Sequence, residues 1–203
     1  MAAEKKSPSH RSGEPPSRAS AIHAPWRLSY MDMLAAPKTT APAAPGSVPT
    51  KPSCFLREYW LSPQRDMANH VIVRTGTEST GRGGLILLNR YPYSNGHLLV
   101  CLGVGRSRLL DYTPEQRAEL WSLTDLATEI CERALEPQGV NIGLNQGAAA
   151  GAGVPEHVHV HVVPRWAGDV NFMAVCANIR VIPSALEDMA KRYRDAWNAI
   201  KPT

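Results

Sequence analysis

A chain of 203 residues, 43% of them hydrophobic, is long enough for one ordinary domain with a hydrophobic core. Its formal net charge of +4 favours phosphate-bearing ligands without identifying them. No stretch approaches the roughly 18 apolar residues of a membrane-spanning helix, so no membrane partner is expected. The four cysteines, Cys54, Cys101, Cys131 and Cys176, are scattered as in proteins of a reducing compartment, so a cytoplasmic location is expected.

The N-terminal part of the chain differs in composition from the rest. Residues 1–22 contain too little apolar surface to offset the entropy cost of ordering, which predicts a disordered tail. Residues 23–52 join an apolar anchor segment around Trp26 to a Pro/Ala-rich linker. A single domain is therefore expected over residues 53–203.

Short apolar runs separated by turn signals follow from about Asn69 and predict about five strands. No P-loop or G-x-G-x-x-G motif follows a strand, so the common nucleotide-binding folds have no support. An α+β domain with a mostly antiparallel sheet fits best. The five runs are Val71–Val73, Leu85–Leu88, Leu98–Cys101, Val140–Leu144 and His157–Val163.

Two amphipathic helices are predicted, one long and one near the C-terminus. The long helix begins after Thr113, which can cap it, with Pro114 in the first helical position and Gln116 where a capping box requires it. Its apolar residues recur at helical spacing and stop before Pro137, so they form a core face. The second helix covers about residues 184–200 and either packs on the sheet or meets a partner subunit.

Three of the seven histidines alternate with valines in the last apolar run. Valines favour a strand and strand side chains alternate, so the imidazoles of His157, His159 and His161 should share one face. An exposed polar strand face would serve equally well with Thr, Lys or Glu. Three histidines in this pattern therefore favour a functional site.

Two kinds of chemistry fit such a face. Alternate histidines on a strand can bind a metal ion, but in a strand Glu156 points to the opposite face, which weakens that case. In phosphoryl chemistry a neutral imidazole attacks phosphorus, while its neighbours orient it and neutralise charge on the phosphate oxygens. The small-residue loop at 145–153 supports this second alternative, because its N–H groups can approach a phosphate; taken alone, it also fits a flexible turn.

With these residues assembled, the chain resembles the histidine triad (HIT) family, whose signature is His-x-His-x-His followed by apolar residues. The motif here occupies residues 157–163. The resemblance runs from about Trp26 to the C-terminus and includes residues 88–100. Residues 164–172 are similar to the bacterial branch of the family that acts on diadenosine polyphosphates.

The resemblance implies a role for individual residues. His159 is the nucleophile that takes the nucleotidyl group, while His157 and His161 orient it and contact the α-phosphate. His97 supports the triad and Asn89 binds the ribose, although the local sequence also fits a strand edge and a turn former. The substrate-binding candidates are Asn89, Asn145, Gln146, Gly151 and Gly153.

Two departures from the family pattern matter. Residues 151–155 lack the Ser, Thr or Gln that contacts the phosphates, so slow turnover or an unusual substrate is expected. Many bacterial relatives hold a structural zinc ion with a Cys-x-x-Cys pair and a further histidine. Here Cys54 has no second cysteine at that spacing and residues 105–108 contain no histidine, so zinc is predicted to be absent.

The resemblance implies an enzyme that cleaves dinucleoside polyphosphates, adenine nucleotides preferred, through a covalent nucleotidyl-histidine intermediate. The likeness at residues 166–172 slightly favours phosphate over water as the acceptor. A homodimer is implied, with the long helix contributing to the interface. No cofactor is required, although a divalent cation can accompany the substrate phosphates, and no nucleic-acid partner is expected.

Three alternatives stay open. The first is hydrolysis of nucleoside phosphoramidates, in which an amine leaves. The second is a nucleotide-binding module with little catalysis, which the missing hydroxyl at Val154 favours. The third is a metal-dependent enzyme that uses the histidines as ligands and loses its activity to chelators.

Overall fold

The computed structural model describes residues 54–169 and 182–201. The predicted tail, anchor segment and linker lie outside these ranges, as do Cys176 and the end of segment 164–172. The domain boundaries therefore stay predictions. None of the described helices is long and apolar enough to cross a membrane.

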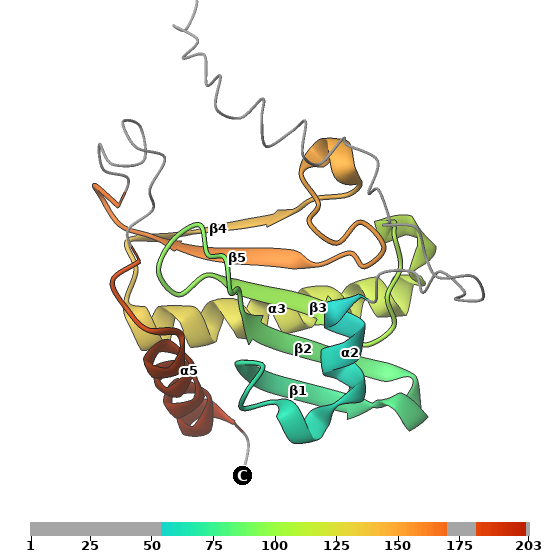
Figure 1. Ribbon diagram of the computed structural model, residues 1–203, viewed down its shortest axis with the longest axis horizontal. Helices are drawn as coiled ribbons and strands as arrows, with labels where there is room; N and C mark the ends of the chain where they lie inside the picture. Colours follow the sequence, from blue (N-terminus) through green and yellow to red (C-terminus); the bar gives the residue numbers. More distant parts are fainter. Residues whose placement is uncertain (1–53, 170–181, 202–203) are drawn as a thin grey trace, which may run out of the picture. The chain divides into compact units, whose positions relative to one another are not determined.

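Five strands form one antiparallel sheet, as the apolar runs predict (Figure 1). The spatial order is β1-β2-β3-β5-β4, so the first three strands form a meander and β4, which follows a long helix, lies at the edge beyond β5. The α+β class is confirmed. The strands are β1 (Val71–Thr77), β2 (Arg82–Leu88), β3 (Leu98–Leu102), β4 (Gly139–Leu144) and β5 (Val160–Arg165).

The histidine strand begins later than its apolar run predicts. β5 starts at Val160, whereas the predicted strand starts at His157. β3 pairs with β5 only as far as the pair of Val100 and Val160, and upstream the N–H of Val158 donates to the carbonyl of Arg106. Two of the three histidines therefore precede the sheet ladder and are held by the loop that follows β3.

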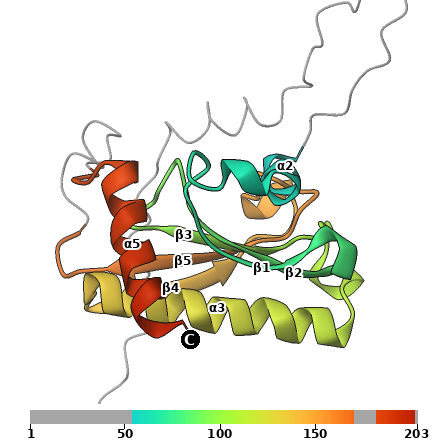
Figure 2. The same cartoon turned by 90° about the horizontal axis from the view of Figure 1, so that it is seen from below.

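Helices cover both faces of the sheet (Figure 2). α3 (Pro114–Leu135) lies along one face and α2 (Phe55–Leu61) lies on the other. α5 (Leu186–Ile200) packs against α3 and β1. α3 and α5 confirm the two predicted helices. α2 is absent from the sequence-based expectation, because seven residues are too few to show a helical period.

α3 begins as its sequence predicts. Oγ1 of Thr113 accepts the N–H of Gln116 at 3.3 Å, and the N–H of Thr113 donates to Oε1 of Gln116 at 3.0 Å. This reciprocal pair is a capping box, with Pro114 in the first turn. The predicted core face is confirmed, and its buried residues are Leu120, Leu123, Thr124, Ala127, Ile130, Cys131 and Ala134.

The alternation of side chains along the histidine segment separates the core from the site. Val158, Val160 and Val162 are at most 2% exposed and belong to the core beneath α3. The core under α2 takes residues from α2, β1, β2 and β3, and none of its described members comes from β5. The histidines between these valines therefore occupy the α2 side of the sheet, next to that core.

α5 and α3 hold the turn that precedes His97. The hydroxyl of Tyr193 donates to the carbonyl of Gly96 at 2.5 Å, and Gly96 has a φ of +79°. A Cβ on Gly96 would lie 2.5 Å from Cδ1 of Leu135, so a side chain does not fit there. Both helices thus fix the backbone that leads into His97.

Candidate active site

The structure brings together the four histidines that the sequence singles out. The ring centroids of His159 and His161 lie 4.9 Å apart, and those of His97 and His161 lie 5.1 Å apart. His97 directly precedes β3, whose Leu98 pairs with Val162 of β5. This register places His97 beside a ring that is 64 residues later in the sequence.

Hydrogen bonds fix the tautomers of His97 and His161. The N–H of Tyr93 donates to Nδ1 of His97 at 3.1 Å. A backbone N–H can only donate, so Nδ1 is an acceptor and Nε2 of the neutral ring carries the proton. Nε2 of His97 lies 3.0 Å from Nδ1 of His161 and donates to it. The proton of a neutral His161 ring is therefore on Nε2.

His159 is fixed in the opposite tautomer. Its Nδ1 lies 2.8 Å from the carbonyl oxygen of His157. A carbonyl can only accept, so Nδ1 carries the proton and Nε2 bears a lone pair in the ring plane. Nε2 of His159 has no hydrogen-bond partner among the described residues, so its lone pair is available to an electrophile.

Burial keeps the triad rings neutral near pH 7. It lowers the pKa of His157 and that of His159 below the ordinary value, against the opposing effect of their hydrogen bonds to backbone carbonyls. Burial and the neighbouring His159 lower the pKa of His161 to about 4. The neutral imidazole is the nucleophilic form, so the protonation state suits attack on phosphorus.

Asn89 and Tyr93 support the histidine cluster. Oδ1 of Asn89 accepts the N–H of Tyr91 at 2.9 Å, which turns Nδ2 of Asn89 to within 3.2 Å of Nδ1 of His97. The ring of Tyr93 stacks on His161, with centroids 5.6 Å apart, and lies 4.8 Å from that of His97. No signal in the sequence separates Tyr93 from its loop neighbours, so sequence reasoning misses it.

Asn145 enters the site through the pairing of β4 with β5. Leu144, the last residue of β4, pairs with Val160, so Asn145 follows at the level of His159. A Cβ on Gly151 would lie 3.8 Å from Nδ2 of Asn145, so this amide faces the small-residue loop. The structure thus places Asn145 between the triad and the loop.

The other loop candidates have different roles. The N–H of Gly151 donates to the carbonyl of Ala148 at 2.9 Å within a turn, so it is already engaged. Oε1 of Gln146 accepts the N–H of Leu109 at 2.8 Å and ties the loop to the segment before α3. The N–H of Gly153 makes no hydrogen bond to another described residue, so it is free to bind a ligand.

The expected direction of Glu156 is wrong. Because its segment precedes β5, Glu156 does not alternate away from the histidines but lines the same cavity of about 340 Å³ as His157. Cys54 also lines this cavity, in a contact with His157 that the sequence does not predict. Within residues 54–169 and 182–201, no group of three or more His, Cys, Asp or Glu side chains is placed to hold a metal ion. The absence of zinc stays a prediction.

Comparison with known proteins identifies the domain. The family model of the HIT domain matches residues 82–168, which include all four site histidines. Residues 82–168 of this chain form a HIT domain. An AP-4-A phosphorylase of Mycobacterium tuberculosis is 42% identical to this chain over 118 residues. These residues are 57% of this chain and 60% of that protein. A bis(5'-nucleosyl)-tetraphosphatase of Schizosaccharomyces pombe is 35% identical over 82 residues, 40% of this chain and 44% of that protein.

Solved HIT structures share the fold. A Zn-bound histidine triad family protein of Mycobacterium smegmatis is 28% identical, with a TM-score of 0.52, over 73% of this chain and 95% of that protein. A hypothetical histidine triad nucleotide-binding protein of Sulfolobus tokodaii is 22% identical, with a TM-score of 0.55, over 70% of this chain and 93% of that protein. The HIT fold expected from the sequence is confirmed. The match to the mycobacterial phosphorylase spans less than two thirds of that relative's length.

The tautomers are directly testable by nitrogen NMR. Nε2 of His157 lies 2.8 Å from the carbonyl oxygen of Leu102, so this ring also carries its proton on Nε2. At pH 7, long-range ¹H–¹⁵N spectra of ¹⁵N-histidine-labelled protein should show His159 protonated on Nδ1, and His97, His157 and His161 protonated on Nε2. The triad rings should titrate below the ordinary pKa of 6.5, and His161 near 4. In a His97→Ala variant, Nδ1 of His161 should shift while His159 stays unchanged. A His159 ring protonated on Nε2 at pH 7 would contradict the assignment.

Proposed function

We propose that this domain cleaves dinucleoside polyphosphates through a covalent nucleotidyl intermediate on His159. The observation that carries the proposal is the hydrogen bond from Nδ1 of His159 to a backbone carbonyl, because it leaves Nε2 unprotonated in a buried, neutral ring. Beside it, the Nε2–H of His161 can donate to a non-bridging phosphate oxygen. A nucleophile and a donor to the developing charge thus lie together.

The reaction has two steps at one phosphorus atom. In the first, Nε2 of His159 attacks the α-phosphorus, an N–P bond forms, and the P–O bond to the polyphosphate breaks so that the leaving group keeps the bonding electrons. In the second, an oxygen of phosphate or water attacks the same phosphorus and the N–P bond breaks. The lone pair returns to Nε2, and an attacking water releases its proton to solvent. With diadenosine tetraphosphate, ATP leaves first and the bound AMP goes to the acceptor.

The relatives support this substrate class. The mycobacterial protein is named for diadenosine tetraphosphate and the yeast protein for dinucleoside tetraphosphates. We extend that substrate class, with adenine preferred, to this chain. Asn89 is proposed to bind the ribose from its place beside His97. Asn145 and the free N–H of Gly153 are proposed to contact the phosphates.

The missing hydroxyl near Val154 is expected to slow turnover. Gly151 cannot compensate with its backbone N–H, since that group already donates to Ala148. Gly153 offers one N–H, and loss of one oxyanion donor typically costs on the order of 10²-fold in rate. This feature favours one second candidate function, a module that binds nucleotides with little catalysis.

A transient adduct tests the nucleophile. Intact mass, measured after brief exposure to diadenosine tetraphosphate and an acid-free quench, should show one added AMP on the wild type and none on His159→Ala. Turnover of this variant should fall by roughly 10⁴-fold or more, because the attacking group is gone.

The matched control is His70→Asn, which changes a histidine outside the site. His70 has a φ of +55°, which asparagine tolerates. This variant should keep both the adduct and the turnover. Both should also persist in a metal chelator, because no metal cofactor is proposed for catalysis. Tight nucleotide binding without any adduct or turnover would replace this proposal by the binding module.

The acceptor is proposed to be phosphate. Phosphorolysis and hydrolysis both release ATP, so the second product distinguishes the two acceptors. In phosphate buffer, diadenosine tetraphosphate should give ATP and ADP, and ³³P-phosphate should appear in the ADP. Formation of ATP and AMP at the same rate with or without phosphate would identify water as the acceptor.

A homodimer is also proposed. β4 is an edge strand, and its Ile142 is 46% exposed. Trp121 on α3 is 44% exposed, which offers further apolar surface on the helix that we propose contributes to the interface. Sedimentation equilibrium should give twice the 22.1 kDa of one chain. Ile142→Asp should weaken the association, and a wild-type monomer at micromolar concentration would contradict it.

The cytoplasm is the proposed location of the protein. The three described cysteines, Cys54, Cys101 and Cys131, are free thiols. Free thiols of this kind are typical of a reducing compartment.

A further inference from the structure

The first histidine of the triad has a partner outside the four-histidine cluster. Sγ of Cys54 lies 3.2 Å from Nδ1 of His157. Nε2 of the same ring lies 2.8 Å from the carbonyl oxygen of Leu102. The carbonyl can only accept, so Nε2 carries the ring proton and Nδ1 is an acceptor. The thiol of Cys54 is therefore the donor to Nδ1.

Both members of this contact are neutral. Burial raises the pKa of the Cys54 thiol, and burial lowers the pKa of the His157 imidazole. The charged groups that face the imidazole are Arg57 and Glu156, which have opposite signs, and the remaining titratable neighbour is His159. The contact is therefore S–H to N, not a thiolate beside an imidazolium.

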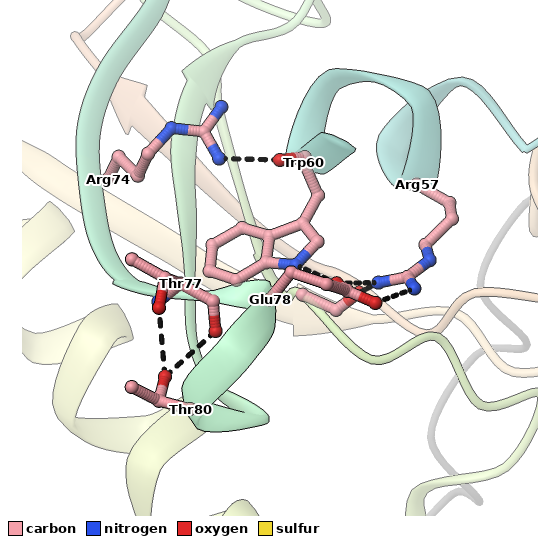
Figure 3. A network of polar contacts seen from close by, with 7 residues as sticks. Arg57, Trp60, Arg74, Thr77, Glu78 and Thr80 are labelled. Carbon is pink, nitrogen blue, oxygen red and sulfur yellow. Dashed lines mark hydrogen bonds and ion pairs between the residues drawn. The ribbon is translucent and has the colours of Figure 1, made fainter. Parts of the chain in front are cut away.

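Polar contacts around Glu78 fix α2, the helix that Cys54 precedes (Figure 3). Nη1 of Arg57 donates to Oε2 of Glu78 and to the carbonyl of Gly103, each at 2.8 Å. Nε1 of Trp60 donates to the same Glu78 oxygen at 2.8 Å. Arg57 and Trp60 belong to α2, Glu78 follows β1 and Gly103 follows β3. The start of α2 is thus tied to two strands.

A second set of contacts holds the end of α2. Arg74 of β1 donates to the carbonyl of Trp60 at 2.8 Å (Figure 3). It also donates to the carbonyl of Tyr59 at 2.8 Å. A Cβ on Gly103 would lie 2.2 Å from the Trp60 ring, so this glycine lets the indole pack directly on the end of β3. Cys54 therefore directly precedes a helix that is held at both ends.

The backbone at Gly105 confines the His157 ring from another direction. A Cβ on Gly105 would lie 2.9 Å from Nδ1 of His157. The ring is thus enclosed by the Gly105 backbone, the Leu102 carbonyl and the Cys54 thiol. Within the described part of the chain, this thiol is the hydrogen-bond partner of Nδ1.

We propose that Cys54 is a positioning residue for nucleotidyl transfer at His159. Its thiol holds the ring of His157, and the carbonyl of His157 in turn accepts the Nδ1–H that fixes His159. Cys54 itself touches no reacting atom. The inference rests on the function proposed above, and it assigns to α2 and its contacts around Glu78 the task of supporting the triad.

The test compares Cys54→Ala with Cys54→Ser, which retains a donor. Cys54→Ala should lower kcat about three- to tenfold, with a smaller change in KM. Without its donor, the neutral form of His157 loses stabilisation, so the acid limb of the pH–rate profile should move to higher pH. Cys54→Ser should restore most of the rate and the wild-type limb. Cys101→Ala, which removes a buried thiol that makes no hydrogen bond to a triad ring among the described residues, should reduce stability but leave the pH profile unchanged.

Nitrogen NMR provides a readout that does not depend on turnover. In Cys54→Ala, Nδ1 of His157 should move towards the position of an acceptor without a donor, and in Cys54→Ser it should not. An unchanged Nδ1 signal and pH profile in Cys54→Ala would overturn the inference, as would equal losses of rate in Cys54→Ala and Cys101→Ala. If the signal moves as expected but wild-type protein cleaves no dinucleoside polyphosphate, the proposed function fails and the thiol contact stands.

Discussion

A backbone carbonyl can only accept a hydrogen bond, and this limit decides the state of His159. Its Nδ1 must carry the proton, so the lone pair is on Nε2, the nitrogen with no partner among the described residues. The same reasoning, applied to the N–H of Tyr93, fixes the proton of His97 and then that of His161. Backbone groups at the two ends of the cluster thus set three tautomers.

The surrounding elements hold these backbone groups in position. The carbonyl that orients His159 belongs to a segment that precedes the sheet ladder, where regular strand pairing does not fix it. Instead, Val158 is buried under α3, and the loop after β3 accepts its N–H. On the opposite side, α2 brings Cys54 against the ring of His157. The turn before His97 is held by the hydroxyl of Tyr193, which donates to the carbonyl of Gly96.

The sequence predicts what depends on local pattern. The alternation of valine and histidine places the triad on one face, and the capping box at Thr113 fixes the start of α3. It does not predict α2, whose seven residues show no period, or Cys54, whose relation to His157 spans 103 positions. The position of Glu156 is predicted wrongly, because its segment precedes β5 and has no strand partner to enforce alternation. The positions of α2, Cys54 and Glu156 depend on contacts between residues far apart in the sequence, and local sequence patterns carry no information on such contacts.

The neutrality of the cluster bears on how it would bind the proposed polyphosphate substrate. Burial lowers the pKa of three adjacent imidazoles, since each charged ring would lose hydration and repel its neighbours. Attraction to phosphate must then come from oriented N–H groups, those of His161 and Gly153 foremost, instead of from net charge in the pocket. Such dipoles are fixed before the substrate arrives, so little reorganisation accompanies the reaction. A protonated cluster would attract the proposed substrate more strongly, but it would lack the lone pair on His159 that the proposed chemistry requires.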